Sequence, residues 1–219
     1  MTPTVVLLHG LARSHRSMGS LRRAIEAAGF QTWSRGYPSR KLSVVEAARI
    51  VAKQIRDEVG DGPVLAVTHS LGGILVRHMG SLVAWRGLVM LAPPNGGSRV
   101  ALRYHAHPLY RWFYGPAGSD ICDPSAWPPP PTPFAVIAGT KSSSLGNPTS
   151  WFTHSLRLFG PDEPNDGTLL VDETRHPAMA AFATVDASHT WIMNHPETHR
   201  LVVEFLRRGD FTASAARVA

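Results

Sequence analysis

The sequence predicts an α/β domain built on a mostly parallel sheet with helices on both faces. Short, continuously apolar runs alternate along the chain with segments in which apolar residues recur every three or four positions. Continuous apolar runs are typical of parallel strands covered on both faces, whereas the longer spacing is typical of amphipathic helices. Their alternation over most of the chain indicates the α/β class.

Five apolar runs are predicted to be strands, and helices are expected between them. The strands are expected at residues 5–8, 64–67, 88–91, 134–138 and 182–185. The clearest helical pattern lies within residues 44–55, where the apolar positions form one stripe. The last helix should begin near Pro196, a residue favoured in first turns, and end at Gly209.

The length and composition fit a single domain that spans residues 1–219. The chain is 43% hydrophobic and 17% charged, which is ordinary for a globular protein. One segment, residues 96–133, lacks a strand pattern and gathers aromatic residues, including Trp112 and Phe113. We expect this insertion to form a lid or cap, with an extra helical pair packed on the sheet as the alternative. Residues after about 211 are expected to be a frayed tail.

The charge of the chain excludes few partners. The formal net charge is +6 and the isoelectric point is near 10.1, but the cations are scattered, so no nucleic-acid tail is indicated. A basic face fits contact with an anionic membrane surface or with acidic substrates, but we expect an ordinary solvated surface. The sequence leaves the oligomeric state open.

Cysteine, histidine and hydropathy patterns argue against several further classes of protein. Cys122 is the single cysteine, which excludes an intrachain disulfide and a cysteine-based zinc site. His105 and His107 lack a third ligand nearby, so we expect no metal site. No signal-peptide core and no run of 18 apolar residues is present in the chain as given, which predicts a cytoplasmic protein; a processed chain would look the same.

The most informative motif follows the second apolar run. There the chain reads Thr68-His69-Ser70-Leu71-Gly72, which matches the nucleophile elbow G-x-S-x-G with Thr in place of the first Gly. Such a strand-to-helix turn exposes the Ser70 hydroxyl and directs the Leu71 N–H toward charge that develops on attack. The alternative is a serine that caps an ordinary helix.

A serine nucleophile needs a base, an acid that orients the base, and donors for an oxyanion. In the order Ser, acid, His, the chain offers Ser70, then Asp166 in an Asn-Asp-Gly turn, then His189 after the last predicted strand. The turn His9-Gly10-Leu11 ends the first strand, so the Leu11 N–H is the expected second oxyanion donor beside that of Leu71.

Other residues compete for the same roles. Asp186, Asp172 and Glu173 are alternative acids, because each lies close in sequence to Asp166 or His189. His195 is an alternative base, although its place before Pro196 suggests a helix cap. We expect His69 to pack beneath the elbow and His9 to be a turn residue hydrogen-bonded locally.

Motifs along nearly the whole chain resemble the α/β-hydrolase superfamily, and within it the small bacterial lipases and esterases. They are His9-Gly10-Leu11, Thr68 to Gly73, Met90-Leu-Ala-Pro-Pro-Asn-Gly-Gly-Ser98, Phe134-Ala-Val-Ile-Ala-Gly-Thr140, Pro164-Asn-Asp-Gly-Thr168, Ser188-His-Thr190, and Phe205-Leu206 with Gly209 and Phe211.

The resemblance implies a carboxylic ester substrate and no cofactor, with Ser70 as nucleophile, Asp166 as acid and His189 as base. Two positions depart from the pattern. Thr68 replaces Gly, which should tighten the elbow without blocking it. Thr190 and Trp191 stand where an acid would follow His189, so the calcium site of some larger lipases is not expected.

The predicted function is therefore that of a serine esterase or lipase acting on small-molecule or lipid esters. Trp112 and Phe113 of the aromatic insertion are expected to shape an apolar acyl pocket. Thioesterase, amidase and acyltransferase activities use the same three side chains and stay open. A binding protein that has lost turnover is the alternative from another class.

Overall fold

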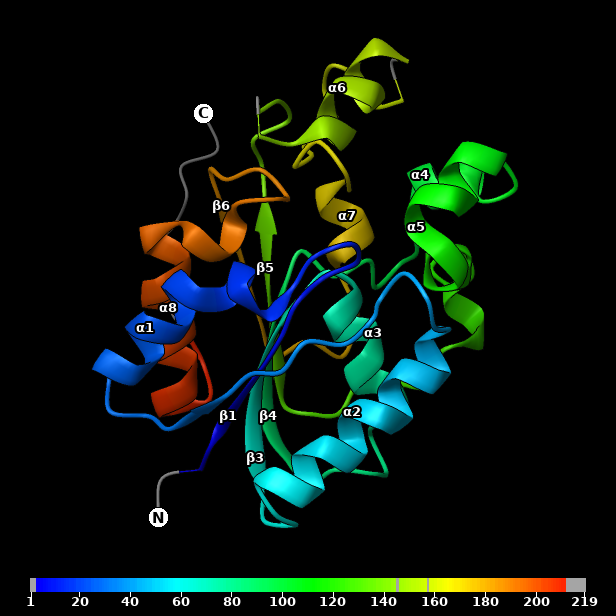
Figure 1. Ribbon diagram of the computed structural model, residues 1–219. Helices are drawn as coiled ribbons and strands as arrows, with labels where there is room; N and C mark the ends of the chain where they lie inside the picture. The colour runs from blue at the N-terminus through cyan, green and yellow to red at the C-terminus, as the bar shows by residue number, and fades with distance from the viewer. Residues whose placement is uncertain (1–2, 145, 157, 212–219) are drawn as a thin grey trace.

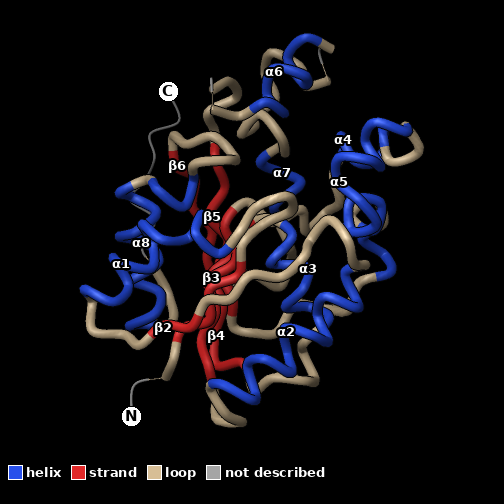
Figure 2. Tube along the Cα trace, viewed as in Figure 1, coloured by secondary structure: helices blue, strands red, loops and turns tan. Residues whose placement is uncertain are grey.

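The fold is a single parallel sheet with helices on both faces (Figures 1 and 2). The computed structural model describes residues 3–144, 146–156 and 158–211. Within them, six strands form the sheet in the order β2-β1-β3-β4-β5-β6, and every neighbouring pair is parallel. The strands are β1 (Val5–Leu8), β2 (Thr32–Trp33), β3 (Val64–His69), β4 (Trp85–Leu91), β5 (Phe134–Gly139) and β6 (Ala181–Val185). The predicted α/β architecture and its five strands are confirmed, and β2 is an additional strand.

Two helix pairs cover the sheet, one pair on each face (Figure 1). α1 (Gly19–Ala27) and α8 (Pro196–Arg208) lie on one face, and α2 (Val44–Glu58) and α3 (Leu71–His78) lie on the other. Successive residues of β1 point to opposite faces. Val5 and Leu7 join the hydrophobic core beneath α1 and α8, whereas Val6 and Leu8 join the core beneath α2 and α3. Burial on both faces explains why the strands read as continuous apolar runs.

Shorter helices occupy the loops between the strands. They are the 3₁₀ helices η1 (His15–Met18), η2 (Pro124–Ala126) and η3 (Ile192–Asn194), and the α-helices α4 (Arg99–Tyr104), α5 (Pro108–Asp120), α6 (Pro148–Ser155) and α7 (Val171–Thr174).

The two helices predicted from periodicity have the ends that their sequences indicate. Ser43 and Glu46 form a capping box at the start of α2. His195 caps α8, since its Nδ1 accepts the Glu197 N–H at 3.3 Å, and Gly209 ends the helix in a left-handed conformation. His195 is therefore a helix cap, as expected.

Residues 96–133 contain α4, α5 and η2 and, as predicted, no strand. α5 is kinked at Gly115, where φ is 68°, and Pro116 follows. At its end, the Asp120 carboxylate accepts the Val44 N–H at the start of α2, at 2.9 Å. Closure of this segment over a site as a lid stays a prediction.

The predicted tail after residue 211 lies outside the described residues. Among the helices of the described ranges, none combines the length and the apolarity that crossing a bilayer requires.

Candidate active site

Ser70 occupies the sharp turn between β3 and α3. Its backbone has φ 51° and ψ −118°, a strained conformation for a residue other than glycine. The turn is compact because Gly72 has no side chain: a Cβ there would lie 2.8 Å from the Leu8 carbonyl oxygen and 3.1 Å from that of His9. Thr68, which replaces the usual glycine, is fully buried, and the strand and helix still pack closely around it. The elbow therefore holds Ser70 at the carboxyl end of a central strand.

Three side chains from separate loops form a continuous hydrogen-bonded row at this edge. His189 Nε2 lies 3.1 Å from Ser70 Oγ, and His189 Nδ1 lies 2.7 Å from Asp166 Oδ2. Asp166 is 1% exposed and His189 is 9% exposed, so the contact between them is shielded from water. A carboxylate only accepts hydrogen bonds, so Nδ1 carries the hydrogen, and Nε2 of the neutral ring is free to accept the Ser70 hydroxyl.

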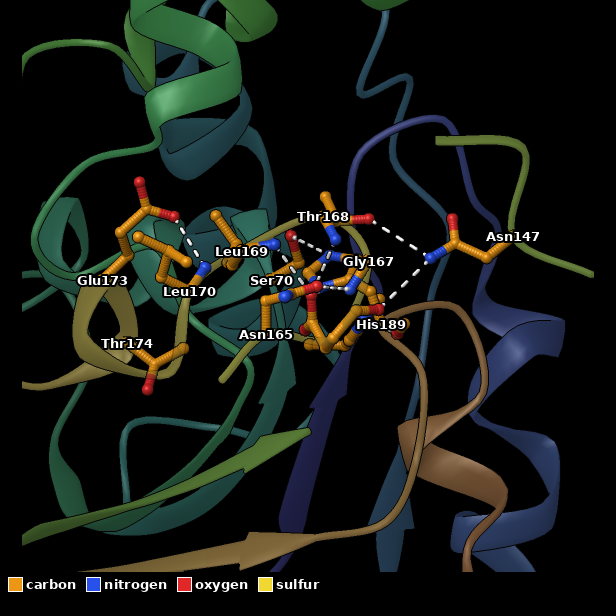
Figure 3. A network of polar contacts seen from close by, with 12 residues as sticks. Ser70, Asn147, Asn165, Gly167, Thr168, Leu169, Leu170, Glu173, Thr174 and His189 are labelled. Carbon is orange, nitrogen blue, oxygen red and sulfur yellow. Dashed lines mark hydrogen bonds and ion pairs between the residues drawn. The ribbon is translucent and has the colours of Figure 1, made fainter. Parts of the chain in front are cut away.

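The Asp166 carboxylate is fixed by its own turn. Its second oxygen, Oδ1, accepts the N–H groups of Thr168 at 2.9 Å and Leu169 at 2.7 Å. Gly167 supplies the positive φ of 85° that the turn needs. Asn147 reaches the same turn, where its Nδ2 donates to the Asp166 carbonyl oxygen at 3.4 Å (Figure 3). One carboxylate oxygen is thus held by backbone, and the other faces His189.

The backbone N–H and the backbone carbonyl of His189 are both hydrogen-bonded. Its N–H donates to the Asp166 carbonyl oxygen at 2.9 Å, and its own carbonyl oxygen accepts from His69 Nε2 at 2.9 Å. His69 is buried, and its ring centroid lies 4.9 Å from that of His189. Burial keeps the pKa of His69 well below its ordinary value, so the ring is neutral. His69 packs beside the elbow, as predicted, and also ties the elbow to the His189 loop.

The turn after β1 passes directly beside the elbow. β1 and β3 are neighbours, with Leu8 opposite Thr68. A Cβ on Gly10 would lie 2.7 Å from His69 Nδ1 and 3.2 Å from Ser70 Cβ, so the Leu11 turn and the Ser70 turn adjoin each other. The Leu71 N–H is the first of α3 and has no partner within that helix. The two predicted oxyanion donors therefore belong to adjoining loops.

His9 is fixed away from the Ser70 hydroxyl by local contacts. Its ring stacks on Tyr37 with centroids 4.1 Å apart, its Nδ1 contacts the Gly10 carbonyl oxygen at 2.8 Å, and its Nε2 accepts the Tyr37 N–H at 3.3 Å. Burial lowers the pKa of His9 to about 4. His9 is a locally bonded turn residue, as expected.

None of the alternative acids contacts His189 within the described ranges. Asp186 is exposed, and Asp172 is exposed and paired with Arg175 at 3.4 Å. The Glu173 carboxylate accepts the N–H groups of Leu170 and Arg99, and burial raises its pKa. Of the four candidate acids, Asp166 is the one whose carboxylate contacts the His189 imidazole.

Trp112 and Phe113 lie on α5 and are 74% and 46% exposed. The Arg40 guanidinium lies over both rings, 5.9 Å and 5.3 Å from their centroids. Their contribution to an acyl pocket stays a prediction. Within the part of the chain that the structure describes, no group of three or more His, Cys, Asp or Glu side chains is arranged to hold a metal ion.

Three positioning contacts were not anticipated from sequence. Asn147 holds the Asp166 turn, Tyr37 holds His9, and Ser39 Oγ accepts the Ala12 N–H at 3.1 Å beside the Leu11 turn. These residues lie in irregular loops, where neither periodicity nor a motif marks them.

Solved structures with the same fold include lipases and esterases. The mature Bacillus licheniformis lipase BlEst2 is 19% identical with a TM-score of 0.73, and the match covers 94% of this chain and 92% of that one. The metagenomic carboxyl esterase MGS0156 is 17% identical with a TM-score of 0.66, over 87% of this chain and 65% of the esterase. A Paleococcus ferrophilus monoacylglycerol lipase is 20% identical with a TM-score of 0.57, over 94% and 95%.

Comparisons by sequence found no match. No protein-family model matches the chain, and no curated protein is similar to it at a significant level. At identities of 17–20%, structural likeness establishes the fold: the chain has the α/β-hydrolase fold that its motifs predicted.

Proposed function

We propose that the chain is a serine hydrolase that cleaves carboxylic esters through an acyl-enzyme intermediate. The observation that carries this proposal is the row of contacts from Ser70 Oγ through the His189 ring to Asp166 Oδ2, at 3.1 Å and 2.7 Å. A serine on an elbow, a histidine within reach of its hydroxyl and a buried acid behind the histidine are the three parts that nucleophilic acyl transfer needs.

Acylation begins with the Ser70 hydroxyl. As Oγ bonds to the ester carbonyl carbon, its proton moves to His189 Nε2 and the carbonyl π electrons move onto oxygen. The N–H groups of Leu11 and Leu71 donate to this oxyanion, while ionised Asp166 offsets the charge of the imidazolium. When the carbonyl re-forms, the bond to the alkoxide breaks, and His189 gives its proton to the departing alcohol.

Deacylation repeats these steps with water. His189 takes a proton from water as the oxygen bonds to the acyl carbon, and the second oxyanion is held by the same N–H groups. Collapse breaks the bond to Ser70 Oγ, which recovers its proton from His189. The net reaction consumes one ester and one water and yields one acid and one alcohol.

The substrate proposed here is a small-molecule or lipid ester. Two of the solved structures above are named lipases and one is named a carboxyl esterase, which supports this class. The same side chains can also serve thioesters, amides or transfer to an acceptor other than water. A binding protein without turnover is the remaining alternative.

A serine-reactive fluorophosphonate probe separates a hydrolase from a binding protein. We expect the native chain to be labelled once and to hydrolyse p-nitrophenyl butyrate, with no loss after EDTA treatment. Ser70→Ala should abolish labelling and lower kcat by roughly 10⁴ to 10⁶. Unlabelled native protein, or labelling that persists in Ser70→Ala, would refute the assignment of Ser70 as nucleophile.

A further inference from the structure

An apolar stripe on α5 faces solvent. Leu109, Trp112 and Phe113 are spaced i, i+3 and i+4, so they share one side of the helix, and they are 69%, 74% and 46% exposed. Leu102 on the neighbouring α4 is 64% exposed. Large apolar side chains grouped in this way on a surface are typical of a site that contacts another apolar phase.

Arginines flank the stripe. Residues 99–119 contain three arginines and no aspartate or glutamate, and the carboxylate of Asp120, which follows them at the end of α5, accepts the Val44 N–H. Arg99 is paired with Glu163 at 2.8 Å, whereas Arg103 and Arg111 are exposed and, in the ranges that the structure describes, have no carboxylate partner. Arg40 also lies over the rings of Trp112 and Phe113.

We propose that this face binds the surface of an anionic phospholipid bilayer. The docking surface comprises Arg40, Leu102, Arg103, Leu109, Arg111, Trp112 and Phe113. Tryptophan beside leucine and arginine suits the bilayer interface, because the apolar groups enter the acyl boundary while the cations meet lipid phosphates. A polyanion such as RNA would satisfy the arginines but leave Leu102 and Leu109 in water. The inference does not depend on the proposed ester hydrolysis.

The docking surface is built on a braced helix. At the kink, a Cβ on Gly115 would collide with the Arg40 carbonyl group, so the helix lies directly against the loop before α2. Arg40 Nη2 donates to the Trp112 carbonyl oxygen at 3.0 Å, and the Tyr114 hydroxyl contacts Thr149 Oγ1 at 3.1 Å. A helix whose backbone is fixed at several points presents its exposed stripe with less ordering cost on binding than a mobile segment would have.

The same loop connects the docking surface to the candidate active site. Ser39, which precedes Arg40, accepts the Ala12 N–H beside the Leu11 turn. Figure 1 shows α4 and α5 beside the sheet, toward the end to which its strands point. A docked bilayer would therefore lie next to the edge of the sheet that carries Ser70.

Vesicle co-sedimentation tests the proposal. The Ser70→Ala protein is mixed with vesicles of phosphatidylcholine alone or with one third phosphatidylglycerol, so that no lipid is consumed. We expect binding to the anionic vesicles, weak binding to the neutral ones, and loss of most binding in molar salt, which screens surface charge within about 3 Å. Brominated lipids should quench tryptophan fluorescence, and Trp112→Ser should remove most of that quenching.

Matched variants decide whether this surface, rather than net charge, is responsible. Arg103→Gln with Arg111→Gln should weaken binding roughly tenfold or more, since each cation near an anionic surface contributes on the order of a fewfold in affinity. Arg49→Gln with Arg56→Gln removes the same charge from exposed positions of α2 and should change little. Circular dichroism confirms that each variant is folded.

Three results would overturn the inference. The first is that the protein does not bind vesicles. The second is that the two pairs of arginine substitutions weaken vesicle binding equally. The third is that the variant with Trp112→Ser and Phe113→Ser still binds heparin while the protein does not bind vesicles. The last would indicate a polyanion site. Failure of fluorophosphonate labelling would refute the proposed function and leave a positive vesicle result intact.

Discussion

At the scale of single residues, the candidate site depends on how firmly His189 is oriented. Its ring is held by Asp166, its N–H by the Asp166 carbonyl and its carbonyl by His69. An imidazole fixed in this way has one tautomer available, with the hydrogen on Nδ1 and the lone pair on Nε2 facing Ser70.

Replacing the acid should destroy that tautomer preference. Asp166→Asn can donate to Nδ1, which places the hydrogen on Nε2, and we expect kcat to fall by roughly 10⁴. Asp186→Asn, an exposed position in the same loop as His189, is the control and should change kcat by less than about tenfold. Both are measured with p-nitrophenyl butyrate. A crippled Asp186→Asn with a near-normal Asp166→Asn would show that the acid is misassigned.

His69 tests the contribution of the backbone contact. In His69→Leu the His189 carbonyl loses its donor, so we expect kcat to fall by up to about 10²-fold with little change in KM. His69→Gln restores an N–H at similar reach and should recover most of the loss. The low-field proton signal of the His189 Nδ1–H should broaden in the leucine variant only. Equal activity of the two variants would indicate that the contact does not position the ring.

The three central side chains could be predicted from sequence because each sits in a local motif. Ser70 follows a buried strand and precedes a glycine, Asp166 lies in an Asn-Asp-Gly turn, and His189 follows the last strand. Asn147 could not be predicted in the same way, since its contact with the Asp166 turn depends on how two irregular loops pack.

At the scale of elements, the elbow depends on how closely α3 approaches β1. Alanine usually stabilises a helix by up to about 1 kcal/mol relative to glycine. At Gly72 the added Cβ would lie 2.8 Å from a backbone oxygen of β1, a contact that only displacement of the helix can relieve. Overpacking of this kind costs about 1–3 kcal/mol, which outweighs the helical gain.

Gly72→Ala should therefore lower both the stability and the activity. We expect a lower urea midpoint and a reduced kcat, because the displaced backbone carries Ser70 on one side and the Leu11 turn on the other. Gly62→Ala is the matched control, since a Cβ there meets nothing within 4 Å. An unchanged midpoint for Gly72→Ala would show that α3 adjusts without cost.

The elements that sequence patterns predicted are those buried on defined faces. β1, β3, β4, β5 and β6 are apolar on both faces, and α2 and α8 carry clear stripes and caps. β2 is only two residues long, too short for any period to register. α7 is only four residues long, and the buried residues of α6 include the polar Ser150 and Thr153, so neither helix has a clear apolar stripe in the sequence.

At the scale of the whole molecule, two neutral histidines are buried at the carboxyl edge of the sheet. Burial lowers the pKa of His9 to about 4 and the pKa of His69 well below its ordinary value. The unfolded chain, whose histidines titrate near 6.5, binds more protons than the folded chain once the pH falls below that value. The free energy of unfolding therefore falls as the pH drops from 6.5 toward 4, and the stability contributed by these groups is fully present above 6.5.

His9→Gln isolates part of this dependence. The lowering of the His9 pKa from 6.5 to about 4 corresponds to a loss of about 3 kcal/mol in the free energy of unfolding on acidification. The variant has no titrating group at position 9, so it should not show this loss. Glutamine keeps a polar group for the Tyr37 N–H, so the fold should persist with a lower stability at pH 7. Urea unfolding measured between pH 7 and pH 4 gives the free energy at each pH for both proteins. The curve of His9→Gln should be the flatter one, because carboxylates contribute equally to both curves and only the histidine differs. Parallel curves would mean that His9 takes up its proton in the folded chain as readily as in the unfolded one.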